Sequence, residues 1–207
     1  MSDPIISIDS LTVDLGGNPV LRDLTFAVAP GEIVAVVGPN GSGKSTLLRC
    51  LAGLQPATAG EVRVFGEAPA DDAGFWGRVA LLSDEPAWYP GLTAREHLEL
   101  MGAVHTAARM TVDAALETFA LAERADAVPL NLSTGQRQRL ALAAALLRPS
   151  SLLLLDEPER GLDAQFRAAL GGLLDEYASE GGTVVMATHD QGLADHGRRV
   201  LPSGVPT

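Results

Sequence analysis

Short apolar runs alternate with glycine- and proline-rich turns over the first third of the chain. Runs of this kind that are rich in valine and isoleucine are typical of β-strands. We expect turns at residues 16–19 and 30–31, and a helix at residues 46–51. The expected strands are residues 5–13, 24–28, 33–37, 61–65 and 78–82.

The apolar positions recur at helical spacing from residue 92 to about residue 147. Thr93 and Glu96 match the capping-box pattern at the start of this stretch. Further helices are expected at residues 112–119 and 136–147. We interpret residues 88–148, approximately, as a helical subdomain inserted into the fold.

Apolar runs at residues 152–155 and 183–187 predict buried strands, with a helix at residues 164–178 between them. Strands that alternate with helices predict an α/β fold with a mainly parallel sheet and helices on both faces. No repeat or linker divides the sequence, so we expect residues 1–207 to form a single domain.

The turn after the expected strand at residues 33–37 has the phosphate-binding pattern G-x-x-x-x-G-K-S. Its glycines let backbone N–H groups approach a ligand, and the next helix adds the positive end of its dipole. Lys44, the only lysine of the chain, supplies a compact charge. The Ser45 hydroxyl is expected to bind the Mg²⁺ that bridges the phosphates. The predicted nucleotide-binding loop comprises Gly38, Pro39, Asn40, Gly41, Ser42, Gly43, Lys44, Ser45 and Thr46.

Asp156 and Glu157 follow a run of four leucines. A buried strand that ends there brings both carboxylates to the edge of the sheet where ligands bind in α/β folds. Asp156 can then join Ser45 as a Mg²⁺ ligand, and Glu157 can reach the water that attacks the γ-phosphate. On this segment alone, a core strand that ends in a solvated acidic turn stays an open alternative.

A second capped helix is predicted at Ser133, because Ser133 and Gln136 match the S-x-x-Q capping box. This helix end, which also contains Thr134 and Gly135, offers N–H groups to a phosphate. Since one phosphate site is already assigned, we interpret it as a contact to a nucleotide on another subunit.

The order of these motifs resembles that of the ATP-binding cassette of ABC transporters, over essentially the whole chain. Residues 132–136 resemble the family signature, Asp163 the D-loop and His189 the switch histidine. The resemblance implies a P-loop NTPase core with a mainly parallel sheet, an N-terminal antiparallel β subdomain and an inserted α-helical subdomain. It also implies that Lys44, Glu157 and His189 are catalytic, with His189 contacting the γ-phosphate and steadying Glu157.

Three positions depart from the family pattern. Leu15 stands where an aromatic residue commonly stacks on adenine, which predicts weaker base selectivity. Asp84 occupies the glutamine position of the Q-loop, where a carboxylate can approach Mg²⁺ or weaken the signal to a membrane partner. Thr134 replaces a glycine of the signature and adds a β-branched side chain near a phosphate contact.

Composition and charge narrow the class of protein. The formal net charge is -11, which opposes a nucleic-acid partner because such a surface needs clustered basic side chains. No apolar run approaches the ~18 residues of a membrane span. The first residues lack the features of a signal peptide, so we expect a cytoplasmic location. Cys50, the only cysteine, is interpreted as a small core residue.

We therefore expect an ATPase subunit that uses ATP and Mg²⁺ and works as a head-to-tail dimer, either with itself or with a paired cassette. Its expected partner is a transmembrane permease, which would hold it at the inner face of the cell membrane. Residues 89–98 resemble the start of the helical subdomain in exporter-type cassettes, so we favour export over import. The short chain and its residues at positions 15 and 84 are similar to the haem-exporter type of cytochrome c maturation.

Other functions fit the sequence less well. ABC ATPases that act on the ribosome or DNA usually carry two cassettes or a long coiled coil, and this acidic single cassette has neither. A P-loop kinase would leave residues 132–136 unexplained, and a GTPase needs an Asn-Lys-x-Asp motif for which no second lysine exists. A regulatory cassette with low activity stays open because of the three departures.

Overall fold

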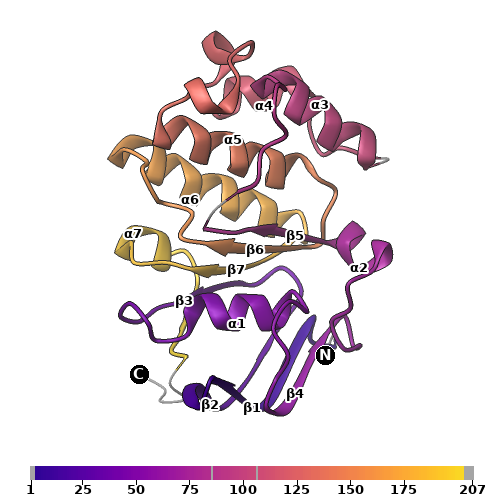
Figure 1. Ribbon diagram of the computed structural model, residues 1–207, viewed down its shortest axis with the longest axis vertical. Helices are drawn as coiled ribbons and strands as arrows, with labels where there is room; N and C mark the ends of the chain where they lie inside the picture. Colours follow the sequence, from indigo (N-terminus) through magenta and orange to yellow (C-terminus); the bar gives the residue numbers. More distant parts are fainter. Residues whose placement is uncertain (1–2, 85, 106, 203–207) are drawn as a thin grey trace.

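The computed structural model describes residues 3–84, 86–105 and 107–202, so Glu85 of the expected Q-loop segment lies outside the described residues. An antiparallel sheet occupies one end of the molecule (Figure 1). Its strands are β1 (Ile6–Leu15), β2 (Asn18–Val28) and β4 (Ala59–Val64). They lie in the order β2-β1-β4, with β1 antiparallel to both neighbours.

A parallel sheet crosses the middle of the molecule in the order β5-β6-β7-β3-β8. Each strand pairs in parallel with its neighbours because a helix or longer connection returns the chain between them. The strands are β3 (Ile33–Val36), β5 (Val79–Leu82), β6 (Leu152–Asp156), β7 (Thr183–Ala187) and β8 (Arg198–Val200).

Helices cover both faces of this sheet (Figure 1). On one side, α1 lies between the parallel and antiparallel sheets, and on the other side α5 and α6 cover the sheet beneath α3 and α4. The α-helices are α1 (Lys44–Leu51), α2 (Ala73–Arg78), α3 (Ala94–Val104), α4 (Val112–Thr118), α5 (Thr134–Leu147), α6 (Ala164–Ser179) and α7 (Gln191–Ala194). Short 3-10 turns lie at Ala122–Arg124 and Pro129–Asn131.

Two apolar cores meet at the parallel sheet. Leu153 and Leu155 belong to the core shared with α3 to α6, whereas Leu152 and Leu154 belong to the core shared with α1 and the antiparallel sheet. Because successive side chains of a strand point to opposite faces, a strand covered on both sides must be apolar throughout. This explains the uninterrupted leucine run and fixes where β6 delivers Asp156.

The expected fold class is confirmed, and several element boundaries differ. The strand β2 begins at Asn18, where a turn was expected, and Pro19 is tolerated because β2 lies at the edge of its sheet. Arg78 ends a helix, α2, that the apolar pattern did not predict. Its start is set by Asp72, whose carboxylate accepts a hydrogen bond from the Phe75 N–H at 2.9 Å.

Two further elements near the C-terminal end of the described chain, α7 and β8, were also not predicted from the sequence. Both are too short to show a period in the apolar pattern. Within the described residues, no helix combines the length and the apolar character needed to cross a membrane.

Candidate active site

The phosphate loop joins β3 to α1, and its last glycine is required by space as well as by conformation. Gly43 has φ 95°, and a Cβ there would lie 2.6 Å from Cδ2 of Leu21 and 2.9 Å from the carbonyl oxygen of Val20. Among the residues that the structure describes, no side chain caps α1, whose first residue is Lys44. The first N–H groups of this helix are therefore available to an anion.

Lys44 is 6% exposed and lies inside the loop. Its Nζ donates to the carbonyl oxygens of Gly38 at 3.0 Å and Pro39 at 3.1 Å. Nearby in sequence, the Ser42 hydroxyl is buried and has no partner among the described residues. A buried hydroxyl without a hydrogen-bond partner is unfavourable, and a polar ligand bound to this loop would supply one.

Ser45 and Asp156 meet at the carboxyl end of the parallel sheet. The Ser45 hydroxyl donates to Oδ1 of Asp156 at 3.1 Å. Burial raises the pKa of the Asp156 carboxyl, and the hydrogen bond from Ser45 opposes that rise. A hydroxyl and a carboxylate are oxygen ligands of the type that Mg²⁺ takes, so these residues fit the metal expected from the sequence.

Glu157 and His189 face each other across the ends of β6 and β7. Oε1 of Glu157 lies 3.4 Å from Nε2 of His189. The Glu157 N–H donates to the Ala187 carbonyl at 2.9 Å, which continues the pairing of β6 with β7 by one residue. Glu157 itself has φ 47°, a left-handed conformation that is unusual for a non-glycine residue.

A cavity of about 390 Å³ connects this carboxylate with the phosphate loop. It is lined by Val20, Asn40, Gly41, Gly43, Lys44, Ser45, Thr46 and Glu157. Leu15 is 42% exposed at the end of β1 and is not among the lining residues, whereas Val20 of β2 is. Sequence reasoning missed Val20, and its place after the Gly-Gly turn was the available signal.

The second predicted helix end is formed as expected. Ser133 caps α5, with its hydroxyl accepting from the Gln136 N–H and its own N–H donating to Oε1 of Gln136. A Cβ at Gly135 would lie 2.5 Å from the Gly161 carbonyl oxygen, so only glycine fits there. The Thr134 methyl group also packs near Gly161, since it lies 3.1 Å from where a Cβ of Gly161 would stand.

Asp163 and Asp84 both pair with arginine. Asp163 caps α6 by accepting from the Phe166 N–H at 2.8 Å, and its other oxygen pairs with Arg139 of α5 at 2.7 Å. The Asp84 carboxylate pairs with Arg160. Asp84 therefore contacts the turn that precedes Asp163, and it is not among the residues that line the cavity at the phosphate loop.

Two residues that sequence reasoning missed stabilise the turn after β6, residues 157–161, and its contact with the segment after β7. Gln138 of α5 is 8% exposed, and its Nε2 donates to the carbonyls of Glu157 at 3.2 Å and Pro158 at 3.1 Å. Glu159 accepts hydrogen bonds from the segment that contains His189. The sequence gives no signal for either contact. Gln138 and Glu159 each bond a segment that is distant along the chain, and Glu159 also lies in an acidic turn where no single carboxylate stands out.

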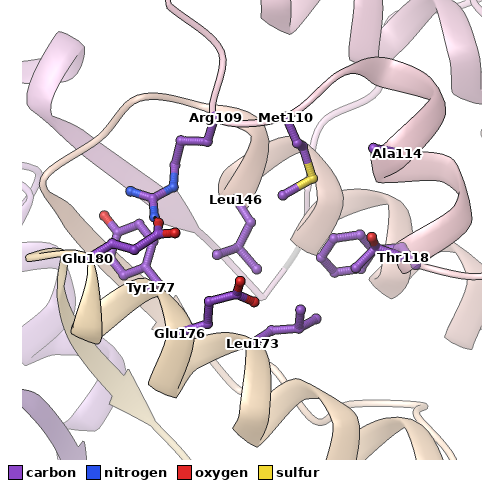
Figure 2. A pocket seen from close by; sticks show the side chains of 10 residues that line it. Arg109, Met110, Ala114, Thr118, Leu146, Leu173, Glu176, Tyr177 and Glu180 are labelled. Atoms are coloured by element: carbon purple, nitrogen blue, oxygen red, sulfur yellow. The ribbon is translucent and has the colours of Figure 1, made fainter.

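A separate cavity of about 240 Å³ lies among α4, α5 and α6 (Figure 2). Arg109 lies along one wall, pairs with Glu180, and stacks over the Tyr177 ring at 4.4 Å from its centroid. Its lining shares no residue with the cavity at the phosphate loop. Arg109 and Glu180 therefore pair with each other in a cavity apart from the candidate active site.

Comparison with known proteins gives consistent results. A family model described as "ABC transporter" matches residues 21–160. The chain is 36% identical over 196 residues to the uncharacterized ABC transporter ATP-binding protein y4fO of Sinorhizobium fredii, which covers 92% of this chain and only 58% of that protein. It is 38% identical over 205 residues to the cytochrome c biogenesis ATP-binding export protein CcmA of Cupriavidus pinatubonensis, which covers 97% of this chain and 86% of that protein.

A solved structure has the same architecture. It is a dimeric structure of the ATP-binding cassette MJ0796 in a post-hydrolysis state, bound to ADP and Pi. The TM-score is 0.83 at 28% identity, with 95% of this chain and 93% of that chain covered.

Proposed function

The chain belongs to the ABC transporter family, as an ABC-type ATPase, and we propose that it powers export through a separate membrane-spanning permease. The observation that carries the ATP-hydrolysing part of this proposal is one cavity lined by Lys44, Ser45 and Glu157. Asp156 contacts Ser45, and His189 contacts Glu157. We treat residues 1–207 as one cassette whose helical subdomain, about residues 88–148, receives the permease.

In the proposed mechanism the phosphate loop binds the triphosphate of ATP. The free N–H groups at the start of α1 and the Lys44 ammonium face the β- and γ-phosphates, which replace the loop carbonyls as partners of Nζ. Ser45 and Asp156 would hold Mg²⁺. When bound, this ion neutralises charge on the phosphate oxygens.

Glu157 is the proposed general base. Its carboxylate accepts a proton from the attacking water while the water oxygen bonds to the γ-phosphorus and the bond to the ADP oxygen breaks. His189, 3.4 Å away, orients this carboxylate and contacts the γ-phosphate. Because Glu157 lies at the end of β6 and His189 just after β7, the pairing of these strands brings the two residues to the same edge of the sheet.

The proposed assembly is a head-to-tail dimer in which the α5 end of one cassette completes the site of another. The end of α5 and the D-loop act together in this proposal, because Gly135 packs on Gly161 and Arg139 pairs with Asp163. The dimeric form of the similar cassette MJ0796 supports this arrangement.

The proposed permease contact is a groove beside the helical subdomain. It has a volume of about 190 Å³ and is lined by Leu81, Leu82, Ser83, Pro86, Ala87, Trp88, Met101, Ala141, Ala144, Ala145 and Arg148. A mostly apolar groove of this kind fits an amphipathic helix, and Trp is enriched at interface hot spots. We propose that a cytoplasmic helix of the permease occupies it and holds the chain at the inner face of the membrane.

ATPase measurements with a co-expressed permease test this proposal. Trp88→Ala is expected to abolish permease stimulation and to leave the basal rate of the isolated chain within about threefold, since Trp88 lies outside the phosphate-loop cavity. The matched control is Trp76→Ala, a tryptophan of α2 whose Nε1 donates to Asp71. Equal stimulation of wild type and Trp88→Ala would remove this groove from the interface. Failure to co-purify with any membrane protein would contradict the transport function.

A further inference from the structure

Glu159 lies in the turn after β6 and makes an unusual set of hydrogen bonds to the segment after β7. Its Oε1 accepts from the Thr188 hydroxyl at 2.8 Å, the His189 N–H at 2.7 Å and the Asp190 N–H at 3.2 Å. One carboxylate oxygen thus fixes the backbone on both sides of His189. Hydrogen bonds to a charged acceptor are stronger than those between neutral groups, so this contact is a firm one.

The same turn holds the His189 ring. Glu157, two residues before Glu159, has Oε1 at 3.4 Å from Nε2 of His189. His189 is therefore contacted twice by one turn, at its ring by Glu157 and at its backbone by Glu159. The turn is itself anchored, because Gln138 donates to the carbonyls of Glu157 and Pro158.

We propose that Glu159 is a positioning residue, which sets the distance between the His189 ring and the Glu157 carboxylate by fixing the backbone of His189. This inference rests on the proposed roles of Glu157 and His189. In this arrangement Glu159 bonds the backbone of His189, and it is not proposed to contact the Glu157 carboxylate or the His189 ring. It acts only by holding the segment from Thr188 to Asp190 against the turn after β6.

The surroundings of the Glu159 carboxylate are unfavourable apart from its three hydrogen bonds. Glu159 places a third carboxylate in a short segment that already carries Asp156 and Glu157. Its second oxygen, Oε2, is buried without a partner among the described residues. Both features are unfavourable by themselves, so the three hydrogen bonds at Oε1 are what this side chain provides.

A purely structural role would be to support the start of α7. Asp190 caps that helix by accepting from the Leu193 N–H at 3.0 Å, and it also pairs with Arg167 at 3.1 Å. These contacts hold α7 independently of Glu159. The two roles differ in a measurable way, since only positioning makes the effect of Glu159 depend on the His189 ring.

The test is a double-mutant cycle on the purified full chain with saturating ATP and Mg²⁺. Glu159→Ala is expected to lower kcat by about 10- to 100-fold, because a displacement near 1 Å at a reacting group costs about 10²-fold. KM for ATP should stay within about threefold, since the phosphate loop is untouched. In the His189→Ala background, adding Glu159→Ala should change kcat by less than about twofold.

Two conservative variants separate reach from charge and avoid dependence on the alanine variant. Glu159→Gln keeps an acceptor oxygen at the same reach and should retain kcat within about fivefold of wild type. Glu159→Asp keeps the charge but is one methylene shorter, so it should lose activity nearly as far as Glu159→Ala. Thermal unfolding of each variant monitors the fold.

The outcomes are distinct. Multiplicative effects of Glu159→Ala and His189→Ala would overturn the positioning role, as would a wild-type kcat in both Glu159→Ala and Glu159→Asp. If the wild-type chain itself does not hydrolyse ATP, or if Glu157→Gln is as active as wild type, the proposed mechanism fails instead.

Discussion

Replacing Gln138 with methionine tests whether α5 holds the turn after β6, residues 157–161, through hydrogen bonds. The side chain is buried and its amide is the donor to the carbonyls of Glu157 and Pro158. Methionine has a similar length and volume, so Gln138→Met removes both hydrogen bonds without leaving a cavity. The change therefore isolates the amide group.

The expected loss of stability follows from what each carbonyl keeps. The Glu157 carbonyl still accepts from the Arg160 N–H at 3.0 Å, so its loss is about 0.5–1.5 kcal/mol. We find no second donor to the Pro158 carbonyl among the described residues, and leaving it unsatisfied costs about 1–3 kcal/mol. A cavity of about 260 Å³ beside Gln138 can admit water, which would bond the Pro158 carbonyl and bring its cost to the lower end of this range. We expect a total near 2 kcal/mol, or a Tm lower by about 4–8 °C.

Activity should fall as well, because the turn holds Glu157 at φ 47° and a left-handed residue costs about 1–2 kcal/mol. Once released, the turn relaxes and kcat is expected to fall about tenfold or more, with ATP affinity unchanged. Thermal unfolding and steady-state ATPase assays measure both effects, with Gln191→Met, an exposed glutamine, as the control. A Tm within about 1 °C of wild type together with an unchanged kcat would refute the reasoning.

Further predictions concern the base, the cysteine and one glycine. ATP and GTP should bind within about tenfold, and Leu15→Tyr should tighten both in competition titrations by about 1–3 kcal/mol; a strong ATP preference unaffected by this change would place base recognition elsewhere. Burial raises the pKa of the Cys50 thiol from 9.0 to about 11, so its stabilising effect is complete below pH 9 and is lost as the pH rises toward 11. Relative to Cys50→Ala, the wild-type free energy of unfolding in urea should fall by about 2–3 kcal/mol over that range, and a constant difference would contradict the burial. Gly182→Ala places a Cβ 2.1 Å from the Tyr177 ring and should lower the unfolding free energy by about 1–3 kcal/mol, whereas Gly172→Ala, with nothing within 4 Å, should not; equal stability of the two variants would show that the ring moves freely.

The parallel core was predictable because its physical causes are local in the sequence. Buried strands need apolar residues on both faces, which explains the leucine run at residues 152–155, and phosphate loops need glycine beside lysine. The capping boxes at Thr93 and Ser133 were equally clear, since each satisfies helix N–H groups within a few residues.

The missing parts are those whose causes are not local. Gln138 and Glu159 gain their contacts from segments that the fold brings together, so residue type alone gave no reason to select them. Asp84 was assigned to the Q-loop from its neighbours in sequence, but its pairing with Arg160 depends on how that segment meets the turn before α6. The helix α2 was missed because Gly74 and Gly77 weaken its propensity, and it is held by the Asp72 cap.

The most direct test of the proposed mechanism is hydrolysis and assembly of Glu157→Gln with ATP and Mg²⁺. Loss of a general base lowers the rate by about 10² to 10⁴, whereas the loop that binds ATP is unchanged. We therefore predict wild-type ATP affinity, hydrolysis reduced at least about 100-fold, and a stable ATP-dependent dimer by size-exclusion chromatography with light scattering. Lys44→Ala, which removes the buried ammonium, should instead lose ATP affinity. A Glu157→Gln chain that stays monomeric with ATP and hydrolyses it at nearly the wild-type rate would contradict the account.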